Sequence, residues 1–178
     1  MRIHSRWKTC TACNLCNFPR VFLRTSENKK PPIDALFIGE APGENEVILK
    51  EPFVGVSGRL LQSAIDKVRL HNDFTYVITN SVICTPYNED KTEIGKPTPV
   101  QANSCFFHIE DCIKVYQPKV IFGLGNVSQG VLKRHKIDHV PLRHPAFVLR
   151  RGGQGSLEYK KFFLLIRREI VNAQKEQI

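Results

Sequence analysis

The chain has 178 residues, 42% of them hydrophobic, which suits one domain with a single core. No apolar run approaches the roughly 20 residues of a membrane span, and the first residues lack the apolar centre of a signal peptide. We therefore expect a soluble, intracellular, cytoplasmic protein with no membrane partner. Its 26 Lys and Arg against 17 Asp and Glu give a net charge of +9 and a pI near 9.4. This excess attracts a polyanion and makes nucleic acid the leading partner, although a merely basic surface would carry the same charge.

Residues 1–33 are predicted to be irregular and to contain the start of a cysteine motif. Three cysteines form a C-x2-C-x2-C pattern and two lie far downstream: Cys10, Cys13, Cys16, Cys84 and Cys105. Cysteines of an intracellular chain are more typical of metal ligands or core thiols than of disulfides. This spacing suits zinc or an iron–sulfur cluster and leaves both open, although the TACNLC stretch has no His for a mixed zinc site. Such a centre would tie the N-terminal segment to the fold.

A buried strand followed by a polar loop is predicted next. The apolar run 35–38 is bounded by Gly39, and a Pro-Gly pair then breaks regular structure. The loop carries three carboxylates and an aromatic residue: Glu40, Glu44, Glu46 and Phe53. Ser57 is predicted to cap the following helix, in which apolar residues recur at helical spacing. Open α/β sheets place their ligands at such loops, although a solvated acidic connection would have the same pattern.

The rest of the chain alternates strands with helices. Further strands are predicted at 74–78, 119–124 and 138–142. The helices are predicted from Pro99, capped by Thr98, to about Tyr116; after Gly125; and from Ser156 onward. Cys112 lies in the first of these and is expected to be a core thiol. Alternation of this kind indicates parallel βαβ units, so we predict an α/β fold with three layers, a four-stranded parallel sheet covered by helices on both faces, in a single domain over 1–178.

Side chains suited to chemistry follow several of these strands. Glu40, Asn80 and His144 each stand at the carboxyl end of a different strand, and the turn 123–125 follows the remaining one. Because these ends meet at one edge of a parallel sheet, we expect the side chains to share a rim. A lone His before Pro is more often structural, but the convergence favours a site. Three arginines flank it: Arg143, Arg150 and Arg151.

Four motifs, in order along the chain, resemble those of the uracil-DNA glycosylase superfamily and in particular its family 4 iron–sulfur enzymes. They are GEAPG at 39–43, PFVGVSGRLL at 52–61, TNSVIC at 79–84 and HPAFVLR at 144–150. The cysteines follow the same pattern, with one after the TN motif and one after a PTP run. The resemblance covers roughly residues 10–151.

The resemblance implies a monofunctional, monomeric DNA repair enzyme that hydrolyses the N-glycosidic bond of uracil in DNA and leaves an abasic site. It implies that a 4Fe–4S cluster is bound by four of the cysteines and that Cys16 is spare: Cys10, Cys13, Cys84 and Cys105. The positions matching those around the uracil are Glu40, Ala41, Pro42, Phe53, Asn80 and His144, with Glu46 also at the pocket.

The residue types agree with this chemistry. Phe53 offers a face on which a flipped pyrimidine stacks. The Asn80 amide can donate to uracil O4 and accept from N3–H, a pairing that cytosine cannot make. His144 near O2 would stabilise the departing anion, and Glu40 and Glu46 are candidates for the remaining catalytic role. Arg143, Arg150 and Arg151 would bind the DNA backbone.

Three positions depart from the patterns of the superfamily. Val47 stands where family 4 usually has Asp, and Lys50 stands where it usually has Gly. Ala41 replaces the water-positioning Asp of the superfamily's best-studied branch, as in family 4. The departures at 47 and 50 favour a rival hypothesis, a superfamily member that has lost excision and acts as a DNA-binding replication or repair accessory. A third reading is a zinc-stapled α/β domain of unrelated activity.

Overall fold

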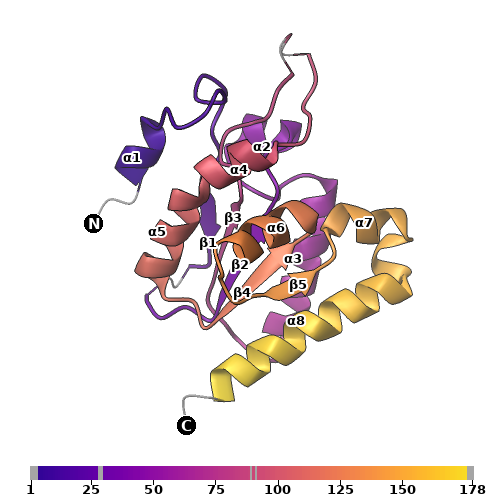
Figure 1. The fold of residues 1–178 in the computed structure, drawn as a ribbon. Coiled ribbons are helices and arrows are strands. Elements are labelled where there is room, and N and C mark those ends of the chain that lie inside the picture. Colours follow the sequence, from indigo (N-terminus) through magenta and orange to yellow (C-terminus); the bar gives the residue numbers. More distant parts are fainter. Residues whose placement is uncertain (1–3, 28–29, 89, 91, 176–178) are drawn as a thin grey trace.

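A central sheet organises the computed structural model shown in Figure 1, which describes residues 4–27, 30–88, 90 and 92–175. Its strands are β1 (Leu23–Thr25), β2 (Ala35–Gly39), β3 (Tyr76–Asn80), β4 (Val120–Leu124) and β5 (Val140–Leu142). In the described residues the order is β1-β3-β2-β4-β5, parallel throughout except for β1 against β3. The predicted α/β class is confirmed, but the predicted count of four strands is wrong by one.

The additional strand, β1, comes from the segment that was predicted to be irregular. It has three half-buried residues at the edge of the sheet, with Arg24 opposite Ile78 of β3. So short a strand shows no hydrophobic alternation, and its pairing with β3 alone identifies it. The same segment also contains a short helix, α1 (His4–Lys8). The described part of this segment, residues 4–27 and 30–33, is therefore more regular than the sequence predicts.

Helices cover both faces of the sheet, as predicted (Figure 1). Successive side chains of a strand point to opposite faces. Ala35 and Phe37 pack in a cluster with α3 (Val56–Arg69), α7 (Pro145–Arg150) and α8 (Leu157–Lys175). Leu36 and Ile38 pack in a second cluster with α4 (Pro99–Ser104), α5 (Phe106–Tyr116) and α6 (Asn126–Arg134). Among the described residues, no helix has the length and apolar content needed to cross a membrane.

The helix predicted from Pro99 to Tyr116 is in fact two helices separated at Cys105. The predicted start is confirmed, since Thr98 forms a capping box with Gln101 and Pro99 occupies the first turn. At Cys105 the carbonyl oxygen accepts from the backbone N–H of His108 and also contacts the His108 ring, which breaks the regular pattern. The break is thus fixed by the His108 side chain, which also contacts the Asn80 carbonyl on β3.

The loop between β2 and α3 is more structured than predicted. It contains the short helix α2 (Glu44–Leu49), and α3 begins at Val56 with Gly55 as its N-cap. The predicted cap at Ser57 is therefore wrong. A Cβ on Gly58 would overlap the backbone of Phe53, so close passage of the loop over this helix requires glycine there.

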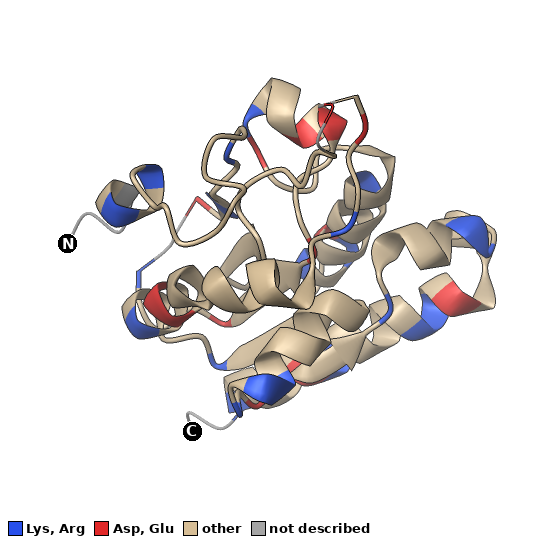
Figure 2. Cartoon of the chain, turned by 45° about the horizontal axis from the view of Figure 1, so that its top comes forward, with Lys and Arg blue, Asp and Glu red and all other residues tan. Residues whose placement is uncertain are grey.

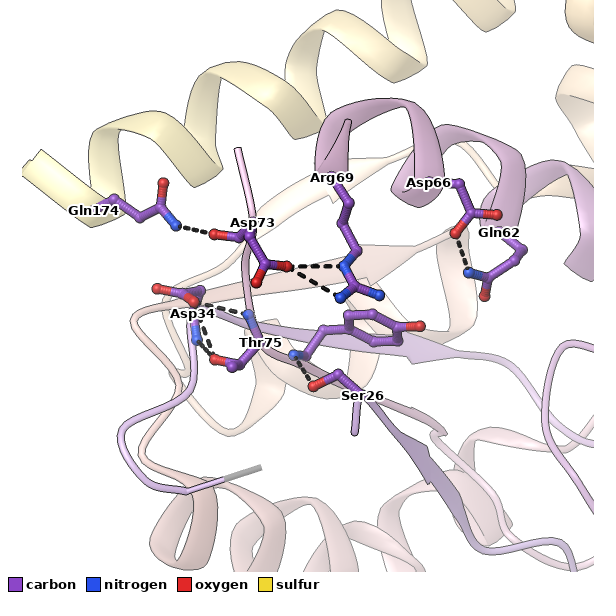
Figure 3. Close-up of polar contacts among 9 residues, drawn as sticks. Ser26, Asp34, Gln62, Asp66, Arg69, Asp73, Thr75 and Gln174 are labelled. Atoms are coloured by element: carbon purple, nitrogen blue, oxygen red, sulfur yellow. Dashed lines mark hydrogen bonds and ion pairs between the residues drawn. The ribbon is translucent and has the colours of Figure 1, made fainter. Parts of the chain in front are cut away.

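A network of polar contacts fixes the amino ends of the strands, at the opposite side of the sheet from this loop (Figure 3). Asp34, just before β2, accepts hydrogen bonds from the Thr75 amide at 2.8 Å and hydroxyl at 3.0 Å. The Lys119 ammonium group lies 2.7 Å from the other carboxylate oxygen. Burial favours the neutral acid, but the bonds from Lys119 and Thr75 outweigh it and lower the pKa of Asp34. Three strands are thus aligned by one carboxylate.

Candidate active site

A cavity of about 680 Å³ opens at the carboxyl edge of the sheet. Four chain segments line it: residues 40–43 after β2, residues 94–96 before α4, the start of α6, and the segment from β5 through α7. The predicted convergence of Glu40, the turn after β4 and His144 on one rim agrees with this lining. Asn80 ends β3, the neighbour of the central strand β2, with Gly39 as its pairing partner.

His144 stands at the N-cap of α7 and lines the cavity. Its Nδ1 accepts a hydrogen bond from the Ala146 amide at 3.2 Å, which places the ring proton on Nε2. Burial, and then the charge of Arg150, lower the pKa of His144, so the ring is neutral near pH 7. Gly125, at φ +86°, packs closely against this residue, since a Cβ added to it would lie 3.0 Å from the His144 Cβ. The ring is therefore held from two sides, with one N–H left to donate.

Phe53 and Asn80 meet above Gly39, and neither side chain is part of the cavity lining. A Cβ on Gly39 would overlap both the Phe53 ring and the Asn80 Oδ1. Asn80 is buried, and the Phe53 and His144 ring centroids lie 6.4 Å apart. Phe53 adopts φ +60°, which is unfavourable for a side chain of this size. The fold thus keeps an aromatic ring and an amide together at a cost in backbone strain.

The two predicted catalytic acids have different surroundings. Glu40 lines the cavity, and its burial raises its pKa, although the charge of Lys96 opposes the rise. Glu46 lies on α2, where its Oε1 accepts a hydrogen bond from the Gly55 amide at 2.9 Å. Glu46 therefore ties the loop to the start of α3, and Glu40 is the acid that faces the cavity. Ala41 and Pro42 also line the cavity, as expected.

Some lining residues were not predicted. Lys96 belongs to the polar loop before α4, where no strand end marks it as a rim residue. Gln129 lies in the first turn of α6, and its amide donates to the carbonyls of Gly123 at 3.1 Å and Leu142 at 2.8 Å. Gln129 lies three residues after Asn126 and therefore on the same face of α6, so this spacing could have predicted its place on the rim.

The flanking arginines surround the outer part of the cavity. Arg143 and Arg150 line it, and Arg143 and Arg151 lie over the Phe147 ring at 5.1 and 5.3 Å. All three are exposed. Figure 2 shows Lys and Arg on many elements, and two glutamates occupy the first turn of α2. The positive charge near α7 is therefore free to meet a polyanion.

The cysteines predicted as ligands lie in one region of the fold. Cys84 and Cys105 are buried in the cluster against which Cys13 packs. Burial raises the pKa of both buried thiols, that of Cys105 to about 12, and the charges of Cys10 and Cys13 add to the effect. Within the described residues no three His, Cys, Asp or Glu side chains are already arranged around a metal position. Cys112 is a core thiol, as expected, and its burial raises its pKa.

Arg20 joins the N-terminal cysteine loop to Cys84, with which it forms an isolated β-bridge. Its guanidinium donates to the carbonyls of Lys8 at 2.9 Å, Cys10 at 2.8 Å and Cys16 at 2.7 Å. The guanidinium also lies beside the Cys84 thiol, where its charge and a hydrogen bond oppose the rise in the pKa of Cys84 that burial causes. A cation that donates next to an all-thiol set fits a group rich in acceptor sulfur.

Comparison with known proteins defines the class to which this fold and site belong. The profile of the Uracil DNA glycosylase superfamily matches residues 28–168, so the chain belongs to this superfamily. Among similar proteins, a type-4 uracil-DNA glycosylase of Saccharolobus solfataricus is 34% identical over 70% of this chain and 55% of its own length. A type-4 uracil-DNA glycosylase of Sulfurisphaera tokodaii is 36% identical over 67% of this chain and 51% of its own length.

A bacterial relative matches over a longer stretch. The type-4 uracil-DNA glycosylase of Thermotoga maritima is 30% identical over 83% of this chain and 82% of its own length. The chain thus spans about half the length of the archaeal relatives and most of the bacterial one. The family resemblance predicted from the motifs is confirmed.

Proposed function

We propose that this protein is a uracil-DNA glycosylase that hydrolyses the N-glycosidic bond of uracil in DNA and leaves an abasic site. The observation that carries the proposal is the position of His144, which lines the cavity while its Nδ1 accepts from the Ala146 amide, so that a neutral ring would carry its proton on Nε2. Bond cleavage leaves negative charge on the uracil, and an N–H donor already aimed at that charge stabilises the transition state. A neutral donor does so without binding the uncharged base in DNA too strongly.

Asn80 and Phe53 are proposed to recognise the base. Both side chains lie over Gly39, next to the cavity-lining residues that follow it, and a pyrimidine would stack on Phe53 with its Watson–Crick edge toward the amide. Uracil O4 and N3–H complement the amide donor and acceptor, whereas cytosine would leave both amide groups facing like partners. A buried amide left unpaired costs about 1–3 kcal/mol, which penalises the wrong base. Ala41 and Pro42 would complete the wall around the uracil.

Glu40 is proposed as the acid that acts on the sugar side of the reaction. As its glycosidic bond breaks, the deoxyribose gains positive charge, and a carboxylate in the cavity wall lowers the energy of that state. Lys96 beside Glu40 favours the charged carboxylate that this role needs. Glu46 is proposed to act indirectly, by holding the loop through Gly55.

DNA binding is proposed to run along the outer rim. Arg143, Arg150 and Arg151 are exposed around α7 and would neutralise phosphates on either side of the flipped nucleotide. Lys96 offers a further positive charge on the opposite wall. Because one chain supplies every wall of the cavity, we infer that a single-domain monomer acts on uracil-containing DNA.

A 4Fe–4S cluster is proposed for Cys10, Cys13, Cys84 and Cys105. The thiol-only donor set, the Arg20 guanidinium beside Cys84 and the resemblance to family 4 enzymes support this proposal. When bound, such a cluster cross-links the N-terminal segment to the core. Anaerobically purified protein should contain about four iron atoms per chain, and stoichiometric zinc would refute the assignment.

The test of the proposed function is incubation with an oligonucleotide that contains one uracil. Abasic sites, seen as strand breaks only after alkali treatment, would support a monofunctional glycosylase. Protein that binds the same DNA without producing them would instead support the accessory hypothesis, which Val47 and Lys50 favour. A control oligonucleotide with cytosine at the same position should remain intact.

A further inference from the structure

One buried histidine connects the cysteine region to the base-recognition region. His108, in the first turn of α5, is fully buried. Its Nδ1 lies 2.5 Å from the Cys105 carbonyl oxygen, and its Nε2 lies 2.6 Å from the Asn80 carbonyl oxygen. Carbonyl oxygens only accept, so a neutral ring donates to one of them and a protonated ring to both. Either way, the ring spans the gap between the two peptides.

The two carbonyls belong to Asn80, which is proposed to recognise the base, and to Cys105, which is proposed to bind the cluster. The Asn80 peptide ends β3, and its orientation sets the direction of the amide side chain above Gly39. The Cys105 peptide lies at the break between α4 and α5, which positions the thiol beside Cys84. A shift at either residue is transmitted to the other, because the ring between them has no free space in which to relax.

The surroundings of His108 favour such transmission. The Trp7 ring meets it edge to face with centroids 5.6 Å apart, and Phe107 packs against it at 6.1 Å. After Asn80, the Ser81 amide and hydroxyl both donate to the Gly39 carbonyl, at 2.9 and 2.8 Å. The chain is therefore held on each side of the Asn80–His108 contact, and packed interiors transmit small displacements rather than absorbing them.

We propose that His108 is a positioning residue that couples the cysteine centre to uracil recognition, so that occupancy of the pocket and retention of the cluster at Cys105 stabilise each other. The inference rests on the proposed function and on the proposed cluster. Coupling between two sites is reciprocal, because each ligand changes the affinity for the other by the same factor. Uracil in the pocket should therefore slow loss of the cluster.

The test measures iron release from anaerobic holoprotein to a chelator, by loss of cluster absorbance, with and without saturating free uracil. We expect uracil to slow release about fivefold in the wild type, the lower end of typical coupling between sites. His108→Phe keeps the ring volume and lacks both nitrogens. This variant should still bind uracil, as followed by a thermal shift, but uracil should slow iron release less than about twofold.

Cys112→Ala is the matched control, since it disturbs the same helix without touching the link. It should keep the wild-type protection. If His108→Phe does not fold, His108→Gln, whose amide keeps a donor but lacks the ring that spans both carbonyls, should show intermediate protection. A wild type without protection, or a His108→Phe variant with full protection, would overturn the inference. Excision by a wild type without protection would refute this inference alone, whereas protection without excision would refute only the proposed function.

Discussion

His144 is committed to a single chemical role by its backbone contact. With Nδ1 bonded to the Ala146 amide, the ring can present only Nε2–H to the cavity. His144→Ala should lower the single-turnover rate of uracil excision by about a hundredfold or more, the range found when an oxyanion donor is lost. DNA affinity should hardly change, because the donor acts on charge that exists only in the transition state. Equal loss of rate and affinity in His144→Ala would show a structural residue instead.

At the level of single residues, the sequence predicts those whose position follows from a strand end. Glu40 and His144 follow strands directly, and both line the cavity. The environment of Glu46 could not be predicted, since its partner is the Gly55 amide nine residues away across a folded loop. Lys96 also escaped prediction, because only tertiary packing brings its loop to the rim. Local pattern thus places side chains on elements, while long-range contacts decide what they bind.

At the scale of elements, α2 ends on a residue that strains the backbone. Lys50 adopts φ 55° and ψ 30° as the C-cap. Glycine reaches this left-handed conformation without steric cost, so Lys50→Gly should stabilise the fold by about 0.5–1 kcal/mol, seen as a higher Tm. Lys160→Gly, at an exposed position inside α8, should instead destabilise by about 1 kcal/mol. A lower Tm for Lys50→Gly would contradict the reading of α2.

Strand alignment at the far edge should depend on pH through Asp34. Its pKa is lowered from 3.8 in the folded state, so its contribution is complete above that value and is lost as pH falls through the folded pKa. Asp34→Asn should cost about 2 kcal/mol at pH 7, typical of charge-assisted bonds, by urea denaturation. The difference from wild type should shrink below about pH 4. Asp66→Asn, at an exposed site on α3, should show little effect at either pH, and a pH-independent cost for Asp34→Asn would refute the account.

The elements differ in how well the sequence could predict them. β2 and β4 lie in continuous apolar runs, and α8 has clear helical spacing, so all three were predicted. β1 is defined only by its pairing with β3. The break at Cys105 depends on His108, whose other contact, Asn80, lies 28 residues away. An element that follows from its own residues can be predicted from the sequence, whereas an element that depends on contacts with a distant segment cannot.

At the scale of the whole molecule, the net charge of +9 should make DNA binding strongly dependent on salt. Arg150→Ala should reduce the slope of log affinity against log salt concentration by about one, because one phosphate contact is lost. Arg167→Ala removes an exposed charge from α8, which does not line the cavity, and should leave the slope unchanged. Equal slopes for wild type and Arg150→Ala would place the DNA elsewhere.

The central claim is that this cavity releases uracil from DNA. The most direct measurement is mass spectrometry of the free base produced under single-turnover conditions from duplexes that carry uracil, cytosine or thymine at one position. The account predicts free uracil at one equivalent per duplex and no free cytosine, whose N4 donor and N3 acceptor do not pair with the Asn80 amide; thymine, which has the pairing edge of uracil, tests whether the pocket accepts a C5 methyl group. Iron-loaded protein that binds the uracil duplex and releases no base would contradict it.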